Sequence, residues 1–313
     1  MSSKKDFRGI EDFTRDDVSQ VFQLARTLKA EARRGQFRPL LGGCSLAMLF
    51  EKPSLRTRAT FDLGMAQLGG HAIYFTPGEV GLGKRESIPD VGRNLERWFD
   101  LVVLRTFAHA NVEQLAAHCS KPVINALSDH EHPCQAMSDY FTLGEHLGSF
   151  DQARLGYLGD GNNVTHSLLL LGALLGADLR VATPAGYEPD PQVVRRARAL
   201  HPRGEAGVWI GHDPRECLKG RNAVYTDIWA SMGQESEAEQ RARAFAAYRL
   251  DRSLLAQAEP GAKVMHCLPA HRGEEITDEV IDGPQSIVFD QAENRLHVQK
   301  AILIYLHRAF RKD

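Results

Sequence analysis

The chain has 313 residues, of which 43% are hydrophobic and 25% are charged, the ordinary balance of a globular protein. The 38 Lys and Arg residues nearly cancel the 40 Asp and Glu residues, which excludes the basic surface that general nucleic-acid or membrane binding requires. No apolar run reaches the ~18 residues of a membrane span, and the first residues lack the apolar core of a signal peptide. We therefore expect a cytoplasmic protein with no nucleic-acid or membrane partner. Its five widely spaced cysteines, with no CxxC pair, also favour a reducing compartment over a disulfide scaffold.

Short apolar runs alternate with helix-length segments, a pattern typical of β-α-β units around parallel sheets. The runs form two sets, and Gly148 with Ser149 interrupts a helix expected over 134–147. We predict an α/β fold of two domains, 1–148 and 149–313, each a parallel sheet flanked by helices. The last helix, about 293–313, is expected to return to the first domain. The expected strands are 44–50, 71–75, 101–105, 123–126, 155–159, 179–182, 207–210, 223–226, 263–268 and 286–289.

The first helix is expected to begin after Thr14, because Asp17 three residues later completes a variant of the capping box. Ligands of open α/β sheets bind beyond the carboxyl ends of the strands, so the residues that follow each strand carry the functional prediction.

An anion site is predicted after the first strand. Pro53 ends that strand and Ser54 is a good N-cap, so a helix opens at 54–57 with N–H groups that attract anions. Arg56 and Thr57 add a guanidinium group and a hydroxyl, and Arg105 ends a neighbouring strand. The alternative is an ordinary capped helix whose arginines are solvated.

A second polar helix start is expected at Pro133, after the fourth strand. His132 and Gln135 flank this start, and a neutral imidazole with an amide suits a small carbonyl-and-amide group. His130 and His132 also have the spacing of metal ligands, but no further His or Cys pair stands at zinc spacing. A turn histidine beside a surface glutamine is the bland alternative.

The second domain opens with a glycine-rich turn over 159–164 that superficially resembles a dinucleotide-binding loop. Val164 replaces its third glycine and no acidic residue ends the next strand, which disfavours a nicotinamide-dependent dehydrogenase. Asn162 and Asn163 instead offer amides to a polar zwitterion, although helix capping is a common role for Asn.

Further along, Asp227 ends a strand, where it can pair with an ammonium group, and 231–233 suggests a hinged loop. Cys267 follows His266 at another strand end, near charges that we expect to lower its pKa, although such cysteines are usually buried hydrophobes. Arg295 is a candidate partner for a carboxylate or phosphate, its alternative being a surface salt bridge.

Taken together, five short motifs in one order resemble the carbamoyltransferase family, in particular its ornithine-type members. The resemblance extends from 13–14 to 293–295, nearly the whole chain. Each motif alone is weak, but five in order, each at an expected strand end, are specific. The motifs are Ser54-Leu55-Arg56-Thr57-Arg58, His132-Pro133-Cys134-Gln135, Asp160-Gly161-Asn162-Asn163, Asp227-Ile228-Trp229-Ala230-Ser231-Met232-Gly233 and His266-Cys267-Leu268-Pro269.

This resemblance implies transfer of a carbamoyl group from carbamoyl phosphate to the δ-amine of ornithine, without metal or cofactor. It implies catalytic roles for Arg105, His132 and Cys267. The implied ornithine-binding residues are Asn163, Asp227, Ser231 and Met232. The implied carbamoyl phosphate-binding residues are Ser54, Leu55, Arg56, Thr57, Arg105, His132, Gln135, Cys267, Leu268 and Arg295.

The resemblance also implies a homotrimer with sites at subunit interfaces. In the family, a loop from a neighbouring subunit often contacts the phosphate through a His or Gln. Gly81 stands at that position here, and Lys84 or Arg85 is a hypothetical substitute.

Two other functions stay open. One is a sister transferase acting on N-acetylornithine, N-succinylornithine, putrescine or aspartate, which the Ser231-Met232-Gly233 string disfavours. The other is a non-catalytic binding or regulatory protein, which fold alone does not exclude. The sequence leaves the biosynthetic or degradative direction open.

Overall fold

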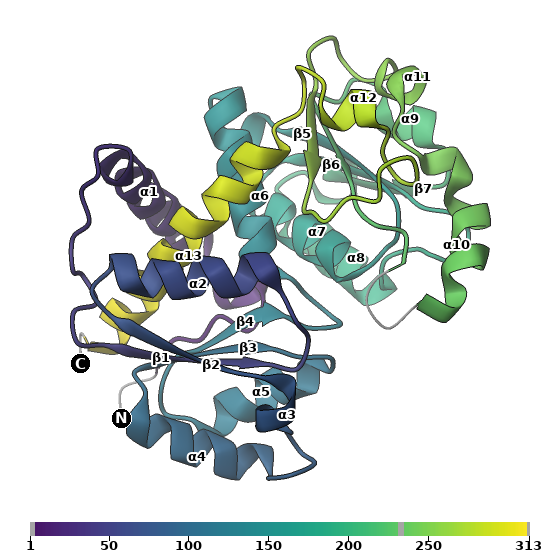
Figure 1. The fold of residues 1–313 in the computed structure, drawn as a ribbon. Helices are drawn as coiled ribbons and strands as arrows, with labels where there is room; N and C mark the ends of the chain where they lie inside the picture. Colours follow the sequence, from purple (N-terminus) through teal and green to yellow (C-terminus); the bar gives the residue numbers. More distant parts are fainter. Residues whose placement is uncertain (1–3, 231–234, 312–313) are drawn as a thin grey trace. The chain divides into compact units, whose positions relative to one another are not determined.

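A computed structural model of the chain describes residues 4–230 and 235–311. They divide into two compact units (Figure 1). Unit 1 comprises the described residues through Ser138 and those from Asn294 onward, and unit 2 comprises Asp139–Glu293. Each unit contains one wholly parallel sheet flanked by helices, so the predicted fold class is confirmed. The division falls within two helices, α6 (Pro133–Leu147) and α13 (Val288–Arg311), while the domain boundary at 148/149 stays a prediction.

The sheet of unit 1 has the strand order β2-β1-β3-β4, which makes β2 an edge strand. Alternate residues of its inner strands point to opposite faces, and both faces are apolar because helices cover each of them. All four strands lie where they were predicted, within a residue at either end. Their bounds are β1 Ser45–Phe50, β2 His71–Phe75, β3 Leu101–Arg105 and β4 Val123–Leu127.

Helices α4 and α5 cover one face of this sheet, where Leu95 and Leu115 pack against Leu49 and Val102, and α1 and α2 lie on the other (Figure 1). The capping box predicted for the first helix is confirmed, since Thr14 Oγ1 accepts the Asp17 N–H and Asp17 accepts the Thr14 N–H. The helices of this part of the chain are η1 Ile10–Asp12, α1 Arg15–Ala32, α2 Leu55–Gln67, α3 Pro77–Val80, α4 Ile88–Trp98 and α5 His109–His118.

The end of the chain returns to unit 1, as predicted. Helix α13 lies along α1 and α2 (Figure 1), and hydrogen bonds join its polar side chains to these helices. Lys29 Nζ donates to Asn294 Oδ1 at 2.7 Å, and Lys300 Nζ donates to Gln67 Oε1 at 2.7 Å. Unit 1 is therefore built from two stretches of sequence that are far apart.

The sheet of unit 2 has the strand order β7-β6-β5-β8-β9, so its first strand in the chain, β5, is central. The strand predicted at 286–289 is wrong. Ser286 makes a single bridge to Val264, and α13 begins at Val288. The apolar run Ile287-Val288-Phe289 is short enough to suit either element, and the exposure of Phe289 agrees with a helix rather than a buried strand. The strand bounds are β5 Arg154–Leu158, β6 Asp178–Ala182, β7 Val208–Gly211, β8 Ala223–Thr226 and β9 Lys263–His266.

Two groups of helices cover the sheet of unit 2 (Figure 1). Helix α7 packs closely on one face, because Gly172 has no Cβ to collide with Tyr140 and Leu179. Leu218, Leu255 and other apolar residues of α9, α11 and α12 form the core on the opposite face. The helices are η2 Phe150–Gln152, α7 Asn163–Leu175, α8 Pro191–Leu200, η3 Gly204–Gly207, α9 Pro214–Leu218, η4 Glu235–Glu237, α10 Ala238–Phe245, η5 Ala246–Tyr248, α11 Arg252–Leu255 and α12 Asp278–Ile281.

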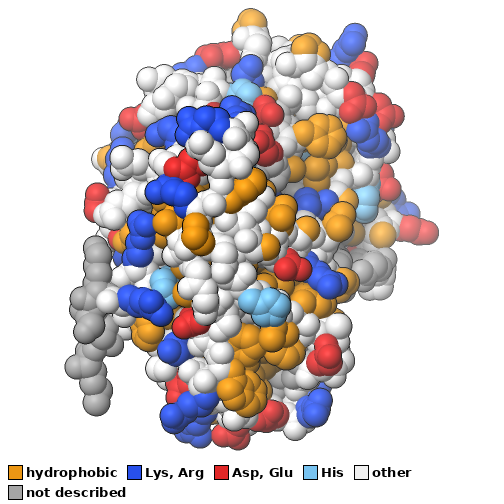
Figure 2. All heavy atoms as spheres, turned by 60° about the vertical axis from the view of Figure 1, so that its left-hand side comes forward, with side chains coloured by type: hydrophobic (Ala, Val, Ile, Leu, Met, Phe, Trp, Pro, Cys, Tyr) orange, Lys and Arg blue, Asp and Glu red, His pale blue; other side chains and the backbone are white. Residues whose placement is uncertain are grey.

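Acidic and basic side chains are interspersed over the face drawn in Figure 2, in keeping with the net charge of −2. Within the described residues, none of the helices combines the length and the apolar character that crossing a membrane requires.

Candidate functional site

The first group of predicted residues lies at the start of α2 in unit 1. Ser54 caps this helix, and its Oγ accepts the N–H of Thr57 at 3.3 Å. The N–H groups of Leu55 and Arg56 belong to the same first turn, where the helix dipole favours a negative charge. Since the Leu55 side chain is 80% exposed, any contribution from Leu55 to an anion site is made by its backbone.

Three arginines gather around this helix start. Arg105, the last residue of β3, is buried, and its Nε has no hydrogen-bond partner among the described residues. Burial and the nearby guanidinium groups of Arg295 and Arg56 lower the pKa of Arg105 to about 10. Arg295, from α13, is also buried and donates to Thr57 Oγ1 at 2.7 Å. The three predicted arginines, which come from separate segments of the sequence, are therefore close enough to repel one another.

His132 and Gln135 are the other predicted binding residues of unit 1. Both side chains are buried at the start of α6, where the Gln135 N–H donates to the His132 carbonyl at 3.1 Å. Burial, followed by the charges of Arg295, Arg105 and Arg56, holds the pKa of His132 well below its usual value of 6.5. The imidazole is therefore neutral at physiological pH.

This arrangement of unit 1 is suited to an anion with several oxygen atoms. Buried cations that repel one another are costly, and an anion among them removes that cost. The guanidinium groups offer paired N–H donors, while the α2 start offers backbone donors. A phosphate group fits this set of donors by charge and by chemistry.

The second group of predicted residues lies in unit 2, at the carboxyl ends of its central strands. Asp227 follows β8 and is buried. Its Oδ2 accepts from Asn162 Nδ2 at 3.0 Å, and its Oδ1 accepts from Cys267 Sγ at 2.9 Å. Asn162 also caps α7, since its Oδ1 accepts the Val164 N–H at 2.9 Å. Asn162 is therefore a helix cap, one of the two roles that the sequence left open, and its amide group also donates to Asp227.

The expected lowering of the Cys267 pKa is wrong. Burial and the neighbouring carboxylates of Asp227 and Asp139 raise the pKa of this thiol well above its ordinary value of 9.0. The error has a simple cause. The sequence indicated charges near the thiol, but the charged group that contacts the sulfur is a carboxylate, Asp227, which accepts its S–H. Cys267 is consequently a hydrogen-bond donor at neutral pH.

The turn after β9 is held by a buried pair of side chains. His266 Nε2 and Glu275 Oε1 lie 3.0 Å apart, and His266 Nδ1 accepts the N–H of Leu268 at 2.9 Å. Leu268 has a left-handed backbone (φ 58°), which this hydrogen bond supports. Ligand atoms of Asp227, His266 and Cys267 lie within 4.8 Å of one another, but both ring nitrogens of His266 are already engaged. A metal ion there would have to displace one of these bonds.

The structure describes some of the remaining predicted residues and not others. Asn163 is the first residue of α7 and half-buried. Ser231 and Met232 lie outside the described residues. In the loop that follows α3, a Cβ at Gly81 would lie 3.0 Å from that of Arg85, so Arg85 occupies the space beside Gly81.

Sequence reasoning missed a second group of buried polar residues close to Cys267. Tyr225 Oη donates to Asp139 Oδ2 at 3.1 Å, and Gln291 Nε2 donates to Asp139 Oδ1 at 2.7 Å. Nothing in the local sequence around these three residues signals that they meet, since they come from β8, α6 and α13.

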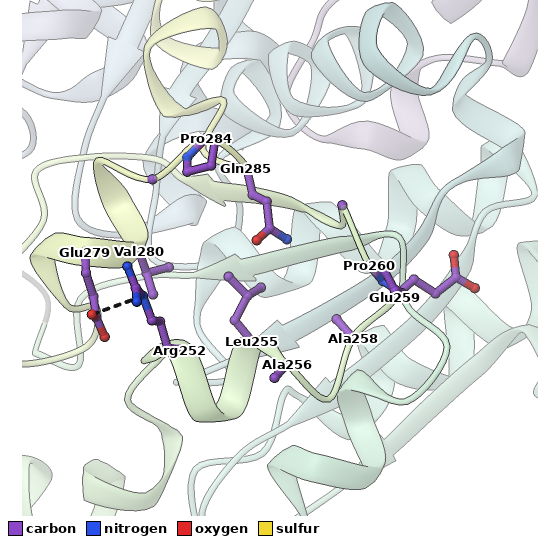
Figure 3. A pocket seen from close by; sticks show the side chains of 12 residues that line it. Arg252, Leu255, Ala256, Ala258, Glu259, Pro260, Glu279, Val280, Pro284 and Gln285 are labelled. Carbon is purple, nitrogen blue, oxygen red and sulfur yellow. Dashed lines mark ion pairs between the residues drawn. The ribbon is translucent and has the colours of Figure 1, made fainter.

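A hollow of about 520 Å³ in unit 2 contains none of the predicted residues (Figure 3). Leu255 and Val280 line it, and an ion pair of 3.2 Å joins Arg252 to Glu279 at its margin. Its lining is largely apolar side chains and backbone, with no cluster of groups suited to catalysis.

Two family models match this chain, one over each part of the sequence. The model of the aspartate/ornithine carbamoyltransferase carbamoyl-P binding domain matches residues 5–145, and that of the Asp/Orn binding domain matches residues 151–306. The chain belongs to the aspartate/ornithine carbamoyltransferase family. The resemblance noted from the five motifs is thereby confirmed.

Individual members of this family are similar over nearly the whole chain. An ornithine carbamoyltransferase of Parafrankia sp. is 51% identical over 296 residues, covering 94% of this chain and 93% of the relative. The solved ornithine carbamoyltransferase from Pyrococcus furiosus is 46% identical, with a TM-score of 0.93 and 96% of each chain covered. The solved enzyme of the same name from Thermus thermophilus is 44% identical, with a TM-score of 0.86, covering 97% of this chain and 99% of the other.

Proposed function

We propose that the chain transfers the carbamoyl group of carbamoyl phosphate to the δ-amine of L-ornithine, giving L-citrulline and phosphate. The observation that carries this proposal is the group of buried cations in unit 1, which suits a phosphoryl ligand. Arg105 is central to this group, because its buried Nε has no hydrogen-bond partner within the described part of the chain. The names of the similar ornithine carbamoyltransferases support the choice of acceptor.

Carbamoyl phosphate would be bound mainly by unit 1. The start of α2, from Ser54 to Thr57, would take the phosphate oxygens, together with Arg56 and Arg105. His132, neutral and buried, would donate to the carbonyl oxygen of the carbamoyl group, and Gln135 would bind its amide. Arg295 would approach the carbamoyl group from α13, and Leu268 would offer its carbonyl.

Ornithine would be bound by unit 2. Asn163, Ser231 and Met232 would hold the amino-acid end, while Asp227 would accept from the δ-amine. Cys267, which donates to Asp227, would fix the direction of that carboxylate. Asp227 would also favour arrival of the δ-ammonium, which has to lose a proton before it can attack.

The proposed reaction is an addition followed by an elimination. The lone pair of the δ-nitrogen forms a bond to the carbamoyl carbon, and negative charge grows on the carbonyl oxygen. Donors such as Thr57, Arg105 and His132 would stabilise that charge, each by roughly 3–4 kcal/mol as in other enzymes. The bond to the phosphate oxygen then breaks, and the δ-nitrogen loses its second proton. No electron acceptor or metal is required by this balance.

Colorimetric detection of citrulline tests the proposal directly. Carbamoyl phosphate is supplied with L-ornithine, N-acetylornithine, putrescine or aspartate in parallel, and ureido products are measured. We expect product with ornithine. Product with another acceptor alone would retain the phosphate site and overturn the ornithine assignment. No product from folded protein would favour a non-catalytic role.

Assembly and cellular setting form part of the proposal. A cytoplasmic homotrimer acting in arginine biosynthesis agrees with the family and with the five free cysteines. Ile73 on the edge strand β2 and Leu63 on α2 are exposed apolar side chains of unit 1, suited to contact with another subunit. Light scattering should give three times the mass of one chain, and a monomer would contradict this.

The cationic turn after α3 has its own test. In a trimer, Lys84 or Arg85 would contact the phosphate bound by a neighbouring subunit, in place of the side chain absent at Gly81. Lys84→Ala and Arg85→Ala should each be measured for the KM of carbamoyl phosphate. An unchanged KM in both variants would refute this contact.

A further inference from the structure

Unit 2 contains a buried carboxylate close to Cys267 that the proposed reaction does not use. Asp139, on α6, has no exposed surface. Its Oδ2 accepts the Tyr225 hydroxyl at 3.1 Å, and its Oδ1 accepts Gln291 Nε2 at 2.7 Å. A buried carboxylate is costly even when it is hydrogen-bonded, so its presence beside the acceptor group of residues requires a reason.

Gln291 links Asp139 to the backbone of His266, the residue that precedes Cys267. Its Nε2 lies 3.2 Å from Tyr225 Oη in addition to its bond with Asp139, so the amide can present only Oε1 on the other side. That oxygen accepts the N–H of His266 at 3.0 Å. His266 directly precedes Cys267, and the carboxylate thus helps to fix where the sulfur lies.

Tyr225 gives Asp139 a second route to the thiol. The phenol has one proton, and it lies within hydrogen-bonding reach of both Asp139 and the Cys267 sulfur. Asp139 competes for that proton, since its Oδ2 accepts the hydroxyl at 3.1 Å, and this competition weakens the hydrogen bond from Tyr225 to the sulfur. The thiol then keeps its own proton and donates it to Asp227 Oδ1 at 2.9 Å.

We propose that Asp139 is a positioning residue of the acceptor site: by holding the Tyr225 hydroxyl and the Gln291 amide, it directs the Cys267 S–H onto Asp227. This inference rests on the proposed function, in which Asp227 faces the δ-amine of ornithine. Loss of Asp139 should accordingly affect ornithine more than carbamoyl phosphate.

Several titratable side chains around the Cys267 thiol affect its pKa and therefore its reactivity. Burial and two carboxylates raise the pKa of Cys267, and a hydrogen bond from Tyr225 lowers it. The titratable side chains that face the sulfur come from α6, β5, β8, the turn after β8 and β9. They are Asp139, Tyr157, Tyr225, Asp227 and His266.

The first test is the alkylation rate of Cys267 by iodoacetamide in Asp139→Asn. The new amide can turn its oxygen to Gln291 and its NH2 to Tyr225, which frees the phenol proton for the sulfur. We expect alkylation at pH 8 to become about tenfold faster, because the thiolate is the reactive form. Peptide mass mapping separates Cys267 from the four other thiols.

A double substitution and a control distinguish this route from general loosening of unit 2. Adding Tyr225→Phe to Asp139→Asn removes the donor and should return the rate towards that of the original protein. Tyr140→Phe is the matched control, since this buried hydroxyl on the same helix donates only to the Leu168 carbonyl, at 3.1 Å. An unchanged rate in Asp139→Asn, or an equal acceleration in Tyr140→Phe, would overturn the proposal.

Steady-state kinetics supply a second, separate readout. In Asp139→Asn we expect kcat/KM for ornithine to fall about tenfold, with the KM of carbamoyl phosphate unchanged within about twofold. Equal losses for both substrates would contradict a positioning role. Should the unsubstituted chain form no citrulline, the proposed function fails, while the alkylation series still tests the Asp139 network. If Asp139→Asn does not fold, Tyr225→Phe alone should slow alkylation at the same pH, and an unchanged rate would refute the geometry.

Discussion

The two units of this chain present opposite electrostatic surroundings to their ligands. Unit 1 gathers Arg56, Arg105 and Arg295 around a helix start, whereas unit 2 gathers Asp227 and the S–H of Cys267. The first suits an anion, and the second suits an ammonium group or amine. Carbamoyl phosphate is an anion and the side chain of ornithine carries an amine, so under the proposed function we expect charge to favour binding of each substrate to its own unit.

The two groups are also constructed differently. In unit 1, charged side chains are placed by element ends, such as Arg105 at the end of β3. In unit 2, Asp227 and Cys267 are held by bonds to other side chains, among them Asn162 and the Asp139 network. A substitution in unit 1 should therefore act mainly through lost charge, and one in unit 2 through lost orientation.

The largest effect is expected from removing a buried charge of unit 1. Arg105→Ala should lower kcat/KM about a thousandfold, since a donor aimed at developing charge contributes roughly 3–4 kcal/mol. It should also abolish the rise in melting temperature caused by inorganic phosphate, which needs no acceptor to be observed. Arg97→Ala, an exposed arginine of the same unit, is the control. Retention of phosphate stabilisation in Arg105→Ala would contradict the anion site.

The next largest effect should come from unit 2. Asp227→Asn keeps the shape but removes the charge, and we expect kcat/KM for ornithine to fall about a hundredfold. Inorganic phosphate should still raise the melting temperature of this variant, whereas it should not raise that of Arg105→Ala. Asp278→Asn, on the exposed part of α12, serves as the control. A loss of phosphate stabilisation in Asp227→Asn would show that the two groups are not separable.

A smaller effect is expected on stability in acid, through His132. The pKa of this residue is held well below 6.5 in the folded chain, so below pH 6.5 the unfolded chain binds a proton that the folded chain does not. The free energy of unfolding should then decrease as pH falls, by up to about 1.4 kcal/mol per pH unit. Urea unfolding at pH 7.5 and 5.5 measures this decrease, and His132→Gln should reduce it. An identical pH dependence in the variant would refute the neutral imidazole.

The smallest expected effect compares the two helix caps. Ser54→Ala and Asn162→Ala should each lower stability by about 1 kcal/mol, because each removes an N-cap acceptor. Asn162→Ser restores the cap but not the amide donor to Asp227. It should recover stability in thermal unfolding while its KM for ornithine stays raised. Full recovery of both quantities would mean that Asn162 acts only as a cap.

Much of the fold could be predicted because strands and helix starts leave local signals. The β1 run, the capping box at Thr14 and the helix start at Pro133 follow from residues within a few positions of one another. The error at 286–289 arose where an apolar run was too short to distinguish a strand from a helix start.

The polar groups were predictable only in part. Their residue types are visible in short motifs, but the state of Cys267 depends on Asp139 and Tyr225, which lie in other elements. The hydrogen bond from Arg295 to Thr57 likewise joins residues 238 positions apart. Such hydrogen bonds between distant residues are determined by tertiary packing, and the sequence near each residue does not indicate them.

The return of α13 to unit 1 also has a consequence for synthesis on the ribosome. The residues from Asn294 onward complete a unit whose other part ends at Ser138, and all of unit 2 is translated between them. Until Arg295 has left the ribosome, Thr57 lacks its partner and the apolar face that α13 covers is open to water. Domains usually fold in order of emergence from the ribosome, but here the first to appear is the last to be finished. A growing chain therefore cannot capture phosphate with its full set of arginines before translation is nearly complete.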